Sequence, residues 1–194
     1  MYAQTNQLIN EKMGANIKLP APNDAAPMPA AELDSITTIA AGSIALDGAT
    51  TVSADVILTT VNTNVTFGST LVSDTTPRDL TITTGGTTGI VKFTGAVGGA
   101  ANNKFKDIAI TGKLDLDGDI GAADFSVEGA ATLAVSGTSA LAADVTTSGT
   151  QTYTGAVSLV DAAGARNLKG STIQFGTTVD AGQQNLAIDG GKIK

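Results

Sequence analysis

The sequence predicts an all-β chain wound as a right-handed parallel β-solenoid, and three observations favour this fold. Short stretches in which apolar and polar residues alternate follow one another along most of the chain, as they do in strands. One degenerate motif recurs, with an aromatic residue, a glycine one or two positions later, and then valine or leucine; it occupies residues 65–71, 91–97, 151–157 and 173–179. Aromatic residues make up only 4% of the chain and tryptophan is absent, so the core must be thin. Such self-similarity is typical of stacked repeats.

The segment 1–30 is predicted to form an arm in front of the body. Apolar residues at nearly helical spacing indicate a short helix over about residues 5–13, and the alternation over residues 15–19 indicates a short strand. Residues 20–29 contain four of the five prolines of the chain, and proline-rich segments adopt extended geometry. We therefore expect a helical and extended arm with a proline-rich spacer over residues 1–30, followed by a solenoid body over residues 31–194.

The body consists of short predicted strands separated by turns that often contain glycine. The strands are expected within residues 43–46, 52–58, 65–72, 79–82, 90–93, 105–110, 113–120, 124–127, 131–135, 140–145, 151–160, 167–175 and 185–188. The alternative fold is a β-sandwich, which also has short strands but normally brings bulkier core residues and tight hairpins. Coils stacked about 4.8 Å apart place like side chains over one another. This arrangement suits the small and β-branched residues of the chain.

The recurring motif resembles the repetitive β-solenoid regions of giant bacterial surface proteins, namely the filamentous-haemagglutinin-like adhesins and related repeat exoproteins. The residues that carry the resemblance are 67–71, 93–97, 153–157 and 175–179, together with the Leu-x-Ile or Ile-x-Ile strands that follow some of these copies. The likeness covers roughly residues 36–194. The resemblance implies a solenoid architecture and an extracellular or cell-surface location.

Composition argues against several classes of function. The net charge is −7 and no basic stripe is present, so nucleic acid is not an expected partner. No apolar run approaches the roughly 20 residues that a membrane-spanning helix needs. Histidine and cysteine are absent, which removes the usual catalytic triads, cysteine nucleophiles and zinc sites. We expect no enzyme activity and no cofactor.

Two pairs of charged residues could provide the catalytic groups of a solenoid that cleaves acidic polysaccharides. They are Arg78 with the adjacent Asp79, and Arg166 with Lys169. Each is an isolated group beside a turn, without a second carboxylate at a defined spacing. We therefore interpret both as surface charges.

Three alternating carboxylates form a weak candidate metal site. Asp115, Asp117 and Asp119 would lie on one face of a strand, where hard oxygen ligands could bind Ca²⁺. The EF-hand pattern fails, because its glycine and glutamate positions are occupied by Ile120 and Ser126. The simpler interpretation is a solvated strand face.

The ends of the chain lead to a hypothesis about assembly. The C-terminal strand region resembles the middle of a repeat, and open strand edges promote polymerisation. We expect a structural protein whose copies stack head to tail into a cell-surface filament, with the arm clasping each joint. The residues assigned to this contact are Ala15, Ile17, Leu19, Leu186, Ile188 and Ile193. The alternative is a fragment of a surface adhesin whose stacked faces bind glycans or host surfaces.

Overall fold

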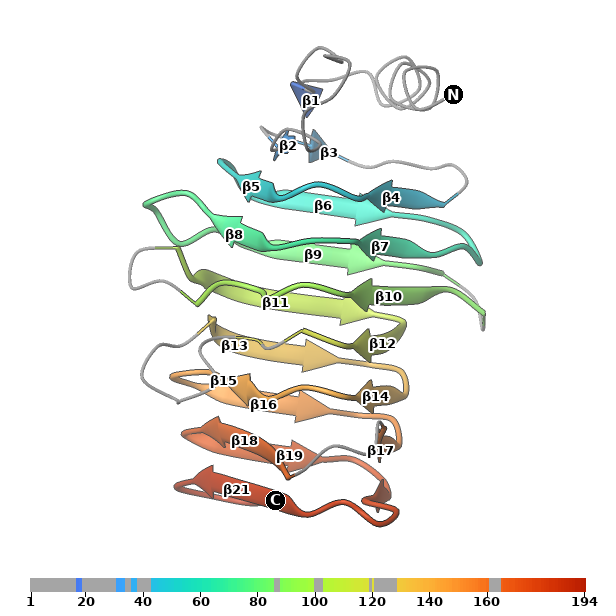
Figure 1. Ribbon diagram of the computed structural model, residues 1–194, viewed down its shortest axis with the longest axis vertical. Coiled ribbons are helices and arrows are strands. Elements are labelled where there is room, and N and C mark those ends of the chain that lie inside the picture. Colours follow the sequence, from blue (N-terminus) through green and yellow to red (C-terminus); the bar gives the residue numbers. More distant parts are fainter. Residues whose placement is uncertain are drawn as a thin grey trace.

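The computed structural model describes residues 17–18, 31–33, 36–37, 43–85, 88–99, 103–118, 120, 129–160 and 165–194. Every regular element in these residues is a β-strand, and the strands form a stack of coils whose axis runs vertically in Figure 1. Each coil crosses three sheets in a fixed order, and then the chain enters the next coil. The predicted β-solenoid is confirmed. The helix expected over residues 5–13 and the spacer over residues 20–29 lie outside the described residues.

Sheet I and sheet II contain seven parallel strands each. Sheet I consists of β3 (Ile36–Thr37), β6 (Val56–Thr59), β9 (Leu80–Thr83), β11 (Phe105–Thr111), β13 (Ala130–Val135), β16 (Thr150–Tyr153) and β19 (Thr172–Phe175). Sheet II consists of β4 (Ile44–Leu46), β7 (Val65–Phe67), β10 (Ile90–Phe93), β12 (Lys113–Leu116), β14 (Ser139–Leu141), β17 (Val157–Leu159) and β20 (Val179–Asp180). The parallel pairing excludes the sandwich alternative, whose neighbouring strands are antiparallel.

Sheet III is less regular than the other two sheets. At the N-terminal end it contains β2 (Ala31–Leu33), β5 (Thr50–Val52) and β8 (Leu71–Ser73), and at the C-terminal end β15 (Val145–Thr146), β18 (Arg166–Gly170) and β21 (Leu186–Gly190). Single bridges through Val97 and Ile120 connect the two parts. The short strand β1 (Ile17–Lys18) pairs with β2 in the antiparallel direction.

The core is built from vertical columns of inward-facing side chains. In sheet I one column runs through Val56, Leu80, Ile108, Leu133, Gln151 and Ile173, which are all buried. Successive members are one coil apart, so the register fixes the length of each coil. Along this column the shortest coil runs from Leu133 to Gln151, and the longest runs from Leu80 to Ile108. The ladder spacing is preserved, and the extra residues lie in the connections.

The recurring motif spans a corner of the coil, which corrects its interpretation as part of a continuous strand. Residues 65–72 divide into β7 and β8 at Gly68, and residues 151–160 divide into β16 and β17 at Gly155. The apolar residues on either side of the corner both face the core. The four-residue spacing between them is therefore the length of a tight corner.

The four motif aromatics stack in two pairs. The ring centroids of Phe67 and Phe93 are 5.3 Å apart, and those of Tyr153 and Phe175 are 5.7 Å apart. The two rings of each pair belong to neighbouring coils, but the two pairs do not occupy equivalent positions. The first pair lies in sheet II and the second in sheet I, because the same corner sequence is used after both sheets.

Candidate functional site

Two aspartates of the candidate calcium site, Asp115 and Asp117, form ion pairs with one lysine. The Nζ atom of Lys92 lies 2.7 Å from a carboxylate oxygen of Asp115 and 2.7 Å from one of Asp117. Lys92 precedes Asp115 by one coil and lies beside it in sheet II. The two carboxylates raise the pKa of Lys92 because they stabilise its charged form. Asp119 lies outside the described residues, and within those residues no group of three acidic ligands could hold a metal.

Arg78 and Asp79 have separate partners. The guanidinium of Arg78 donates two hydrogen bonds to Asp74, at 3.0 and 2.7 Å, and this pairing lowers the pKa of the Asp74 carboxyl. Asp79 accepts a hydrogen bond from Lys106 in the next coil at 2.9 Å. The two residues therefore tie a loop and two coils together, and they do not converge on one site.

Arg166 and Lys169 differ in burial and in the groups that they contact. Arg166 is buried in β18 and its side chain donates to the carbonyl of Ala165 at 3.4 Å. The Lys169 ammonium is more exposed and lies 3.9 Å from the carboxylate of Asp189. Among the described residues, these contacts involve one backbone carbonyl and one carboxylate, whereas glycosidic bond cleavage uses a pair of carboxylates.

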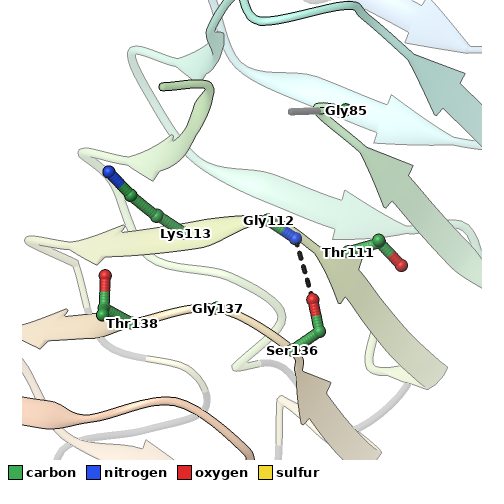
Figure 2. Close-up of a pocket in the computed structure, with 7 residues that line it drawn as sticks. All are labelled: Gly85, Thr111, Gly112, Lys113, Ser136, Gly137 and Thr138. Carbon is green, nitrogen blue, oxygen red and sulfur yellow. Dashed lines mark hydrogen bonds between the residues drawn. The ribbon is translucent and has the colours of Figure 1, made fainter. Parts of the chain in front are cut away.

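An open pocket of about 370 Å³ lies at the corner between sheets I and II. Its lining residues are shown in Figure 2: Gly85, Thr111, Gly112, Lys113, Ser136, Gly137 and Thr138. The backbone N–H of Gly112 donates to the Ser136 hydroxyl at 3.1 Å, which joins two coils. The described lining contains no carboxylate and no aromatic ring. The pocket therefore offers one ammonium group and a few hydroxyls, and it is a space between stacked corners.

A polar cluster lies inside the core at the shortest coil. The Gln151 amide donates to the carbonyls of Lys169 at 2.7 Å and Val145 at 3.1 Å. The Tyr153 hydroxyl donates to the Gln151 side-chain oxygen at 3.1 Å. Both residues are fully buried. Sequence reasoning missed this cluster, although the alternation of Gln151 and Tyr153 already places them on the same face of a strand.

The buried tyrosine predicts a loss of stability at alkaline pH. Burial raises the pKa of Tyr153 well above its usual value. The unfolded chain therefore releases this proton near pH 10, whereas the folded chain retains it. The contribution of the buried Tyr153 hydroxyl to the free energy of unfolding is complete below pH 10. Above pH 10, the free energy of unfolding should fall by about 1.4 kcal/mol per pH unit. The matched control is Tyr153→Phe. Urea unfolding between pH 8 and pH 11 should show a steeper decline in the wild type than in this variant.

Strands β1 and β21, which contain three of the residues assigned to assembly, lie at opposite ends of the stack (Figure 1). Ile17 lies in β1, whereas Ala15 and Leu19 are outside the described residues. Leu186 and Ile188 lie in β21 and are partly buried against the core. Ile193 pairs with Ile173 beyond β19, and 59% of its surface is exposed. The C-terminal residues therefore continue the inward columns with only one side covered.

No family model matches the chain, and comparisons with curated proteins and with solved structures also give no match. Among the described residues, no helix is long and apolar enough to span a membrane. The β-solenoid fold is consistent with the likeness to bacterial repeat exoproteins, but no match links the chain to that family.

Proposed function

We propose that the protein is a structural β-solenoid subunit whose copies stack end to end, C-terminal coil on N-terminal coil, into a filament at the cell surface. The observation that carries the proposal is the exposed apolar end of the columns. Ile188 and Ile193 are the last members of the columns in sheets III and I. A second copy of the same chain is the occupant whose columns match them.

The direction of the strands also favours a second copy of the chain as the molecule that stacks on the last coil. All neighbouring strands in sheets I and II run parallel, so the outer edge of the last coil repeats the hydrogen-bonding pattern of every edge inside the stack. Only a strand of the same direction continues that pattern. Because the contact joins two different surfaces of the molecule, it repeats without closing and produces a filament.

The spacing of the end coils supports it as well. Followed through the backbone register of the strands, Ile188 is in line with Ala31 of the first coil, and Ile193 is in line with Ile36. Ile36 follows Ala31 at the same sequence separation as Ile193 follows Ile188. The corner between sheets III and I is longer in the next coil, where Thr50 is followed by Val56. The two end coils therefore share one corner length, and one can stack on the other.

A charge at the end of a column should block this assembly. In Ile193→Asp, the joint loses the burial of one isoleucine, about 1.5–3 kcal/mol, and gains the cost of a desolvated carboxylate. The concentration at which filaments form should rise by at least about tenfold. Light scattering and electron microscopy measure this concentration.

The matched control is Ile57→Asp. Ile57 is 41% exposed, but it lies on the outer face of sheet I and one coil in from the N-terminal coil, so it is outside the inward columns that meet at the joint. The Ile57→Asp substitution should leave the concentration at which filaments form unchanged. Equal effects of the two substitutions would contradict an end-to-end contact. A chain that stays monomeric at high concentration, both with and without residues 1–30, would refute the proposed function itself.

A further inference from the structure

Strand β1 differs in direction from every other described strand that pairs in a sheet. It runs antiparallel to β2, with Ile17 opposite Leu33 and Lys18 opposite Glu32. All other strand pairs among the described residues are parallel. An antiparallel strand ends a parallel ladder, because its outer edge no longer presents the pattern that the next parallel strand needs.

The edge covered by β1 is the edge that the proposed filament requires. Sheet III begins with β2 and finishes with β21, and stacking joins β21 of one copy to β2 of the next. The column from Ala31 to Ile188 fixes this register. Strand β1 occupies the same side of β2 as the incoming β21 would. The two pairings therefore exclude each other.

The internal pairing needs no second molecule. The register places residue 18 opposite residue 32 within one chain. This pairing is therefore independent of protein concentration, whereas stacking of a second copy on β2 depends on it. The isolated chain should therefore keep β1 in place.

We propose that β1 is an autoinhibitory strand, which occupies the β2 edge in the isolated subunit and must leave it before a second copy can stack there. The inference rests on the proposed filament function, and it reverses the sign of the role that the sequence suggested for the arm. The arm delays assembly, whereas a clasp would promote it. Because the paired segment is so short, the strand can open without disturbing the coils.

Deleting residues 1–30 tests whether the arm delays assembly or promotes it. The variant keeps β2 and lacks β1, so it should form filaments more readily. The protein concentration at which filaments form should fall by about tenfold, as the loss of a pairing worth roughly two backbone hydrogen bonds allows. A circular dichroism spectrum like that of the wild type shows that the body is folded. A deletion that abolishes filaments formed by the full chain would overturn the inference and restore the clasp.

A removable lock provides the second test. Lys18→Cys combined with Glu32→Cys adds the only two thiols to a cysteine-free chain and leaves the net charge unchanged. Facing residues of an antiparallel pair are about 4.5–5.5 Å apart at Cα, within the range of a disulfide. The oxidised variant should remain monomeric, and dithiothreitol should restore assembly. Wild-type chain with dithiothreitol controls for the reductant.

The outcomes separate the two proposals. Filaments that form equally well from the oxidised and reduced lock would refute the autoinhibitory strand and leave the filament function standing. Absence of filaments from the wild type, the deletion and the reduced lock would instead refute the filament function. Filaments from the deletion and the reduced lock, but not from the oxidised lock, support both.

Discussion

Phe93→Ala should lower the free energy of unfolding by about 3–5 kcal/mol, as expected for a fully buried phenylalanine. Phe93 is 0% exposed and lies in the middle of a sheet II column, between Phe67 in the preceding coil and Leu116 in the next. Its ring stacks on Phe67 with centroids 5.3 Å apart. In a stacked-repeat protein, stability comes from contacts between neighbouring coils. The substitution weakens both contacts of one coil.

The matched control is Phe175→Ala. Phe175 stacks on Tyr153 but belongs to the last sheet I strand and is only partly buried. Its removal affects one coil contact, so the loss should be clearly smaller. Denaturant unfolding followed by circular dichroism measures both values. Equal losses at the two positions would contradict the picture of a core held together coil by coil.

The sequence indicated many of the strands because a strand depends on local alternation of apolar and polar residues. The inward-facing residues of β7, β10 and β16 can be identified from their period of two. The assignment of strands to sheets was not predictable. The corner after Phe93 and the corner after Tyr153 have nearly the same sequence, yet the first follows sheet II and the second follows sheet I.

The ion pairs between coils were also beyond sequence reasoning. Lys92 meets Asp115 only because the length of the intervening connection brings the two residues into register in sheet II. Neighbouring coils differ in length, so no fixed period identifies the partner. The same uncertainty made Asp115 and Asp117 resemble a free acidic face, since the lysine between them is distant in sequence.

Gly137→Ala should cost about 3 kcal/mol or more, at the upper end of the range for overpacked positions. Gly137 lies at the corner between sheets I and II, directly against Gly112 of the preceding coil and Gly155 of the next. A Cβ atom at Gly137 would lie 2.4 Å from the Gly112 carbonyl oxygen, and one at Gly155 would lie 2.3 Å from the Gly137 oxygen. The obstructing atoms are backbone. They can move only if the coils separate, and separation breaks the ladder hydrogen bonds on both sides of the corner.

Gly182→Ala separates this steric effect from the conformational freedom of glycine. Gly182 has a φ of 55°, and a Cβ atom there would meet no atom within 4 Å. Its substitution should therefore cost only the strain of a left-handed residue, about 1–2 kcal/mol. No such strain is present at Gly137, whose loss should come from the clash alone. Thermal unfolding should rank Gly137→Ala well below Gly182→Ala in melting temperature. The reverse order would mean that the coils can move apart at their corners, and that close backbone contact there does not determine the stacking distance.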